Sequence, residues 1–246
     1  QSLTRLLPTD PVPFFRDLAA RHTPAGAGAY RALWQELESR ARQRVDDFLR
    51  QAPFGEFVAV REVLAALPPD TRLQLGNSMP VRYASFLGLP PAVARANANR
   101  GVSGIDGTLS TAVGAALATT APTVLLTGDL AFFYDRNGLW HNHLPPNLRI
   151  VLLNNGGGGI FNLIDGPDRL PPAERERYFF TPHSLTARRT AADHDCAYFL
   201  VRTPTELRQC LPSFFAPSPK PAILEIQTDS ERNAEVFREF KWVCFG

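Results

Sequence analysis

A carboxylate and a carboxamide stand at the ends of two apolar segments of the sequence, in positions that suit a metal ion. Asp129 follows the segment 123–127, and Asn155 follows the segment 149–153, 26 residues further along the chain. This spacing is about one strand–helix–strand unit, so neighbouring parallel strands would bring both side chains to one gap. Mg²⁺ binds one or two protein oxygens together with water and phosphate oxygens, whereas Ca²⁺ requires more protein oxygens. The pair therefore indicates a site for Mg²⁺ and a diphosphate.

Small polar residues and glycines gather in four successive loops, each placed after an apolar segment. The four loops are 76–78, 99–107, 128–130 and 154–159. Glycine lets backbone N–H groups approach an anion closely, and a helix start adds the positive end of its dipole. Each loop alone is compatible with an ordinary turn, but the four together indicate one site assembled at one edge of a sheet.

Other kinds of site are less favoured by the sequence. The glycines of 101–107 and 156–159 do not form GxGxxG, and GxxxxGK[ST] does not occur, which argues against a nicotinamide site and a P-loop. His141 and His143 stand two apart on an expected helix and would point to different faces. No serine lies in GxSxG, and the acidic and thiol group 193–196 is interpreted as a capping turn.

The elements that must hold these loops alternate along the chain. Helices are expected at 30–52 and 56–67, before the first strand. The segments that predict strands are 72–75, 93–96, 123–127, 149–153, 198–201 and 222–227. The later segments that predict helices are 80–87, 106–119, 130–143, 160–164, 204–215 and 231–240. This alternation predicts an α/β fold, a doubly wound, mainly parallel sheet with helices on both faces, which binds ligands at the carboxyl ends of its strands.

Composition narrows the class of protein. The chain has 246 residues, of which 44% are apolar, and a net charge of +2; it can form a core and offers no electrostatic case for nucleic acid binding. No apolar run reaches the roughly 18 residues needed to cross a bilayer, so no membrane span is expected. Cys196, Cys210 and Cys244 form no CxxC motif and suit a reduced, cytoplasmic chain. Because the chain begins at Gln1 and its sole methionine is Met79, we expect a fragment of a longer protein.

The motifs taken together resemble a known family. Gly128-Asp129 followed by Asn154-Asn155 is similar to the signature of thiamine-diphosphate-dependent enzymes, although Leu130 replaces the usual third glycine. Within that family the resemblance is to the MenD branch, the menaquinone-pathway synthases that join 2-oxoglutarate to isochorismate. It covers most of residues 53–246. The segments that carry it are GNSMPVR (76–82), ANRGVSGIDG (98–107), GDLAFFYDRNGL (128–139), NNGGGGIF (154–161) and ERERYF (174–179).

The resemblance implies roles for individual residues. Mg²⁺, or Mn²⁺ in its place, would be bound by Asp129, the side chain of Asn155 and the backbone carbonyl of Gly157. Thiamine diphosphate would also contact Ser103, Gly104, Ile105, Gly128, Leu130 and Gly158. Of these, Ile105 would hold the two rings of the cofactor in a bent shape. The substrates would be bound by Ser78, Arg82 and Arg100, beside an apolar wall of Ile160, Phe161 and Ile164.

The resemblance also implies a domain organisation and partners. Residues 1–52 would be the end of a middle domain with a connecting helix, and residues 53–246 would be the diphosphate-binding domain. The pyrimidine-binding domain, which carries the family's catalytic glutamate, would lie outside this chain, in the same or a partner subunit of a homodimer or homotetramer. We therefore expect no catalytic residue in this chain and no activity from it alone.

Two alternatives stay open. The chain could belong to another thiamine-diphosphate carboligase or 2-oxo acid decarboxylase. It could also be a non-catalytic assembly module of the same fold.

Overall fold

The computed structural model describes residues 4–22 and 27–245 and divides the chain into two compact units. The first unit ends at Gln43, and the second, which begins at Arg44, contains the whole sheet. The domain boundary expected after residue 52 stays a prediction. None of the helices in the two described ranges is both long enough and apolar enough to cross a lipid bilayer.

The helices that precede the sheet are α1 (Pro11–Arg21), α2 (Ala27–Gln51) and α3 (Glu56–Ala65). α2 and α3 match two expected helices to within a few residues at each end. α1 occupies a Pro-rich segment in which no helix is expected. It begins there because the Asp10 side chain accepts the Val12 N–H at 2.8 Å and because proline suits the first turn of a helix.

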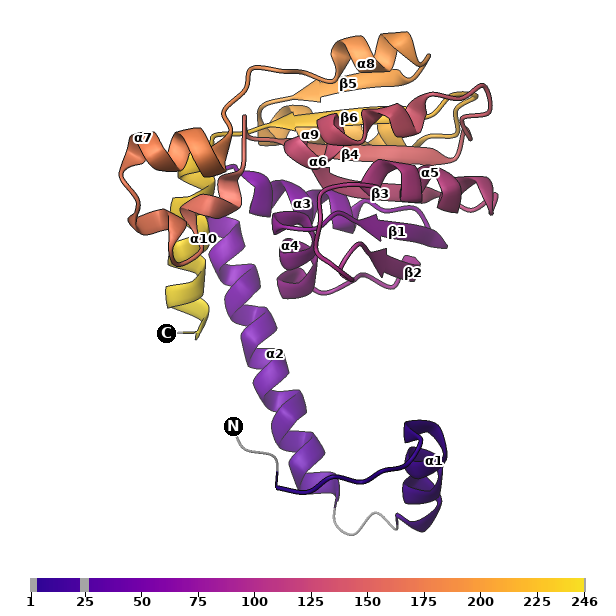
Figure 1. Ribbon diagram of the computed structural model, residues 1–246, viewed down its shortest axis with the longest axis vertical. Helices are drawn as coiled ribbons and strands as arrows, with labels where there is room; N and C mark the ends of the chain where they lie inside the picture. Colours follow the sequence, from indigo (N-terminus) through magenta and orange to yellow (C-terminus); the bar gives the residue numbers. More distant parts are fainter. Residues whose placement is uncertain (1–3, 23–26, 246) are drawn as a thin grey trace. The chain divides into compact units, whose positions relative to one another are not determined.

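The centre of the second unit is a six-stranded, wholly parallel sheet (Figure 1). Its strands are β1 (Thr71–Leu75), β2 (Val93–Ala98), β3 (Thr123–Gly128), β4 (Leu148–Asn154), β5 (Ala197–Val201) and β6 (Ala222–Gln227). They lie in the order β2-β1-β3-β4-β6-β5. The order reverses between β1 and β3, because β2 lies on one side of β1 while β3 and β4 lie on the other. Doubly wound sheets bind ligands at such a reversal.

Helices cover both faces of the sheet. One face packs against α3, α4 (Met79–Leu87), α9 (Pro204–Phe215) and α10 (Ser230–Phe245). The other face packs against α5 (Thr108–Leu117), α6 (Asp129–Tyr134) and α8 (Arg188–Asp193). Side chains of one strand alternate between the two cores, with Val124 and Leu126 in the first and Leu125 in the second. The predicted doubly wound α/β fold is therefore confirmed.

The prediction of a helix over 130–143 is wrong, because the helix observed there is much shorter. α6 ends at Tyr134 and is followed by the 3₁₀ turn Arg136–Leu139. At the residue where the helix stops, the Asp135 side chain turns to α5 and accepts hydrogen bonds from the N–H and the hydroxyl of Ser110, both at 2.7 Å. The apolar spacing of the segment does not reveal this contact between helices.

The long segment between β4 and α8 consists of short turns. They are the 3₁₀ turns Gly159–Asn162 and Pro167–Arg169, helix α7 (Pro172–Arg175) and the π-helical turn Glu176–Phe180. The first of them replaces the helix expected over 160–164. Glu225, which is buried on β6, holds both ends of the segment: its carboxylate accepts hydrogen bonds from the Asn154 side chain, the Ala187 N–H and the Tyr198 hydroxyl, each at 2.8 Å.

Candidate functional site

A cavity of about 360 Å³ opens at the carboxyl ends of β1, β3 and β4, where the strand order reverses. Every predicted site residue except Gly104 lines it. These lining residues are Ser78, Arg82, Arg100, Ser103, Ile105, Gly128, Asp129, Leu130, Asn155, Gly157, Gly158, Ile160, Phe161 and Ile164. Gly104 is not in the lining, and a side chain there would collide with the carboxylate of Asp106. Its contact with the cofactor stays a prediction.

Asp129 lies at the end of β3 with only 3% of its surface exposed. Its Oδ2 accepts hydrogen bonds from the N–H groups of Asn155, Gly156 and Gly157, at 3.1, 2.9 and 3.0 Å. The two strand ends meet because β3 and β4 are neighbours in the sheet, as the spacing of 26 residues predicts. Asp129 thus ties the glycine loop after β4 to the end of β3.

His183 also faces Asp129. Its Nε2 lies 3.3 Å from Oδ2 of Asp129, and its ring packs edge-on against Phe133 with 5.3 Å between ring centroids. Its Nδ1 accepts the Leu185 N–H at 3.1 Å, so a neutral ring carries its proton on Nε2, the nitrogen that faces the carboxylate. His183 belongs to none of the motifs that predict the site from the sequence.

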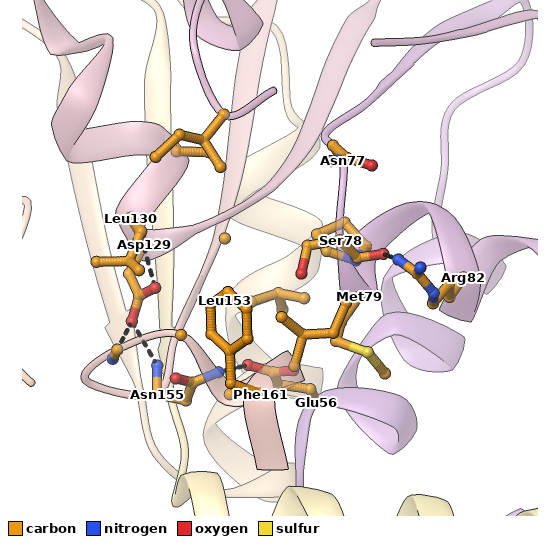
Figure 2. A pocket seen from close by; sticks show the side chains of 18 of the residues that line it. Glu56, Asn77, Ser78, Met79, Arg82, Asp129, Leu130, Leu153, Asn155 and Phe161 are labelled. Carbon is orange, nitrogen blue, oxygen red and sulfur yellow. Dashed lines mark hydrogen bonds between the residues drawn. The ribbon is translucent and has the colours of Figure 1, made fainter. Parts of the chain in front are cut away.

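The two ends of the Asn155 amide have different surroundings (Figure 2). Nδ2 donates to Oε1 of Glu56 at 2.6 Å, whereas Oδ1 is buried and has no hydrogen-bond partner among the described residues. Glu56 is 2% exposed and also accepts a hydrogen bond from the Tyr83 hydroxyl at 3.0 Å. Burial raises the pKa of Glu56 to about 7; the hydrogen bond from Asn155 opposes the rise, and the negative charge of Asp129 adds to it.

The oxygens at this end of the cavity fit a magnesium ion. Asn155 Oδ1 has no competing partner in the described part of the chain. Asp129 Oδ1 accepts one hydrogen bond, from the Leu130 N–H at 2.7 Å, and the Gly157 carbonyl accepts one from the Gly159 N–H at 3.0 Å, so each oxygen keeps a lone pair. Three such oxygens leave the remaining positions of an octahedron to phosphate and water. Within the described ranges no cluster of three or more His, Cys, Asp and Glu side chains offers another metal site.

Two arginines, Arg82 and Arg100, line the cavity, and Arg82 lies on the side opposite Asp129 (Figure 2). Arg82 donates to the Ser78 carbonyl at 2.7 Å, and Arg100 donates to the side-chain oxygen of Asn77. Neither arginine forms an ion pair with a carboxylate of the residues described. Burial lowers the pKa of Arg82, and the positive charge of Arg100 lowers it further. Two cations without a carboxylate partner suit a ligand that brings its own carboxylates.

Two serines of the cavity have backbone angles that residues other than glycine rarely adopt. The φ angle is 75° at Ser78 and 59° at Ser103, and both residues line the cavity. Such strain persists where the surrounding structure enforces it, and it is frequent at binding sites. The loops after β1 and β2 are therefore held in a shape that local preference alone would not give.

Glu56 is the buried charged residue of the cavity that the sequence analysis missed. It is the first residue of α3 and stands 99 residues before Asn155 in the chain. Its position is set by Asn233, whose Oδ1 accepts the Glu56 N–H at 3.0 Å. Asn233 comes close enough because residue 55 is glycine, where a Cβ would lie 2.6 Å from Oδ1 of Asn233. The local sequence feature that points to this position is the dipeptide Gly55-Glu56 at the start of an apolar helix.

Substitution of Gly157 by alanine tests how closely the loop 154–159 is packed. A Cβ at this position would lie 2.7 Å from the Phe180 carbonyl oxygen and 2.8 Å from the Phe180 ring. We expect Gly157→Ala to lower the free energy of unfolding by about 2 kcal/mol, because neither the backbone nor the ring can withdraw freely. Urea denaturation measures this change.

Gly114→Ala is the matched control for that substitution. Gly114 lies in α5 with nothing within 4 Å of the added Cβ, so the free energy of unfolding should rise by about 0.5 to 1 kcal/mol. Equal effects of the two substitutions would contradict close packing of the loop.

Similar proteins were found by sequence. The chain is 49% identical over 209 residues to a 2-succinyl-5-enolpyruvyl-6-hydroxy-3-cyclohexene-1-carboxylate synthase of Cytophaga hutchinsonii, which covers 85% of this chain and 37% of the relative. Proteins of the same name from Flavobacterium johnsoniae and Bacteroides fragilis are 34% and 33% identical, each over 97% of this chain and 42% of the relative. No protein-family model matches the chain.

A solved structure has a similar fold. An X-ray structure of a Mycobacterium smegmatis protein assigned to the thiamin diphosphate-dependent enzymes matches with a TM-score of 0.55 and 24% identity, over 72% of this chain and 32% of that chain. At this identity the match concerns the fold alone. The chain thus spans about 37 to 42% of the length of the three relatives by sequence and about a third of this structural neighbour.

Proposed function

The chain belongs to the family of the 2-succinyl-5-enolpyruvyl-6-hydroxy-3-cyclohexene-1-carboxylate synthases, and from this membership we propose its function. It is the C-terminal, diphosphate-binding part of a thiamine-diphosphate-dependent transferase. The complete enzyme joins the four-carbon remainder of 2-oxoglutarate, after loss of CO₂, to isochorismate in menaquinone biosynthesis. We place it in the cytoplasm, in keeping with the thiol argument from the sequence.

One observation carries the proposal: Asp129 and Asn155 meet at the carboxyl ends of the neighbouring strands β3 and β4, with a buried amide oxygen that lacks a partner among the described residues. Asp129, Asn155 and the Gly157 carbonyl would hold Mg²⁺, which in turn holds the diphosphate of the cofactor. Ser103, Gly104, Ile105, Gly128, Leu130 and Gly158 would contact the rest of it. When bound, thiamine diphosphate supplies a carbanion that attacks and cleaves 2-oxo acids.

The residues of this chain would bind and orient the substrates. Arg82 and Arg100 would each pair with a carboxylate, because a guanidinium fork matches the two oxygens of that group. Ser78 would add a hydroxyl. Ile160, Phe161 and Ile164 would exclude water from the reacting carbon, which strengthens the electrostatic interactions in the cavity.

The proposal assigns the proton transfers that start the reaction to another domain. The family's glutamate belongs to the pyrimidine-binding domain, supplied by the same or a partner subunit of a homodimer or homotetramer. Residues 1–52 would be the end of a middle domain and residues 53–246 the diphosphate-binding domain. The 246-residue chain alone should therefore release no CO₂ from 2-oxoglutarate.

The experiment compares this chain with a full-length protein that also contains the pyrimidine-binding domain. With thiamine diphosphate and Mg²⁺, the full-length protein should release CO₂ from 2-oxoglutarate and form the adduct with isochorismate, while the isolated chain does neither. Turnover of pyruvate in preference to 2-oxoglutarate would replace the proposal by another carboligase or decarboxylase. Turnover by the isolated chain would overturn the assignment of the glutamate, and no cofactor requirement in the full-length protein would favour an assembly module.

A further inference from the structure

Glu56 holds one end of the Asn155 amide and has no role in the function proposed above. Its Oε1 accepts from Nδ2 of Asn155 at 2.6 Å, and its Oε2 accepts from the Tyr83 hydroxyl at 3.0 Å. Its backbone N–H is anchored by Asn233 at 3.0 Å. Both carboxylate oxygens therefore receive donors, and the start of α3 is fixed in place. This geometry leaves Glu56 little freedom to release Asn155.

The orientation of the Asn155 amide decides what faces the metal site. In the observed orientation Nδ2 meets Glu56, and Oδ1 is buried on the side of Asp129 without a partner in the described ranges (Figure 2). If the amide were turned by half a rotation, Nδ2 would face the metal site, and an N–H group cannot coordinate a cation. Because both oxygens of Glu56 accept hydrogen bonds, from Asn155 and from Tyr83, the carboxyl group holds the nitrogen end of the amide and not the oxygen end.

We infer that Glu56 is a positioning residue that orients the Asn155 amide, so that its oxygen faces the cation of the cofactor. The inference rests on the proposed function, because it presumes that Asn155 binds Mg²⁺. Groups that orient metal ligands in this way typically change metal affinity by about 10- to 100-fold when they are replaced. Glu56 itself touches neither the cation nor the substrate.

Glu56→Gln is the direct test, since it keeps the size of the side chain and adds a donor. The Tyr83 hydroxyl would continue to donate to the remaining oxygen of residue 56, which leaves the new –NH₂ group facing Asn155. That group would hold the Oδ1 end of Asn155 and turn Nδ2 toward the metal site. We expect the Mg²⁺ concentration that half-saturates cofactor binding to rise about 10- to 100-fold in this variant.

Tyr83→Phe separates orientation from general packing. Alone it leaves the hydrogen bond between Glu56 and Asn155 intact, so the Mg²⁺ affinity should stay within about twofold of the wild type even if stability falls. Combined with Glu56→Gln it frees the new amide to turn its oxygen to Asn155. The double variant should therefore recover part of the lost Mg²⁺ affinity. If both substitutions caused only structural defects, their losses of affinity would add.

The measurement is calorimetric titration of Mg²⁺ into full-length protein with saturating thiamine diphosphate, with circular dichroism to verify the fold. Asn155→Ala defines the affinity without the amide. Absence of Mg²⁺-dependent cofactor binding in the wild type would refute the proposed function itself. Normal Mg²⁺ affinity in Glu56→Gln, or a double variant weaker than the single one, would refute only the positioning role. If Glu56→Gln does not fold, Glu56→Asp, whose carboxylate is too short to reach Asn155, should show the same loss.

Discussion

Replacement of Asp129 by alanine should lower the free energy of unfolding by about 3 to 5 kcal/mol, because three loop N–H groups lose their shared acceptor and only that of Gly156 keeps another, Oδ1 of Asn154 at 3.2 Å. The groups belong to Asn155, Gly156 and Gly157, and all three donate to the same carboxylate oxygen. Asp129 is 3% exposed, so water cannot replace the lost acceptor without a movement of the loop. The predicted loss is therefore large for a substitution that removes only a small side chain.

Urea denaturation of the 246-residue chain measures this loss, and Asp129→Asn separates it from metal binding. The asparagine keeps one acceptor oxygen for the loop, so it should lose about 1 to 2 kcal/mol. In a full-length protein both variants should lose Mg²⁺-dependent cofactor binding, because neither retains the charge. If Asp129→Ala unfolds at the same urea concentration as the wild type, the carboxylate does not hold the loop.

The meeting of Asp129 and Asn155 could be predicted because it follows from regular structure. Two strands that are separated in the chain by a single helix are neighbours in a parallel sheet more often than not. Their carboxyl ends then lie at the same edge of the sheet. The register confirms this: Gly128 at the end of β3 pairs with Leu153 of β4.

The adjacent asparagines show where such reasoning stops. The Asn154 side chain donates to Glu225 on β6 at 2.8 Å and serves the fold, whereas the Asn155 side chain lines the cavity. Successive side chains of a strand point to opposite faces, so one of the two had to face each way. The spacing of 26 residues from Asp129 pointed to Asn155, but spacing alone does not establish which of two adjacent asparagines faces the cavity.

Long-range contacts account for the residues that the sequence left unassigned. Glu56 accepts a hydrogen bond from Asn155, 99 positions further along the chain, and Asp135, which follows α6, accepts one from Ser110, 25 positions before it. Neither contact leaves a periodic pattern, because each joins single side chains from separate elements. Hydrophobic spacing predicts which segments form strands and helices, but not which polar group of one element meets another.

In a full-length protein, Arg82→Gln should weaken substrate binding and at the same time raise the stability of the fold. A guanidinium paired with a carboxylate contributes about 1.5 to 3 kcal/mol, so the KM for one dicarboxylate substrate should rise roughly 10- to 100-fold. The change should fall mainly on KM, because the carboxylate is held equally in the ground state and the transition state. Arg100→Gln should act in the same direction.

The same substitution should raise the free energy of unfolding of the protein without substrate. Burial and the charge of Arg100 both lower the pKa of Arg82, which means that the folded chain disfavours this cation. The arginine makes no ion pair with a carboxylate of the described residues that would offset this. Binding sites commonly give up stability in this way, and because solvent screens a charge that is only partly buried, removing it should return no more than about 0.5 kcal/mol.

Arg208→Gln on α9 is the matched control, because Arg208 is exposed and lies outside the cavity. It should change neither KM nor the free energy of unfolding by more than about 0.5 kcal/mol. Steady-state kinetics with 2-oxoglutarate and isochorismate varied in turn would show which substrate Arg82 holds. An unchanged KM for both substrates in Arg82→Gln, together with lower stability, would mean that the arginine is structural and that the carboxylates bind elsewhere.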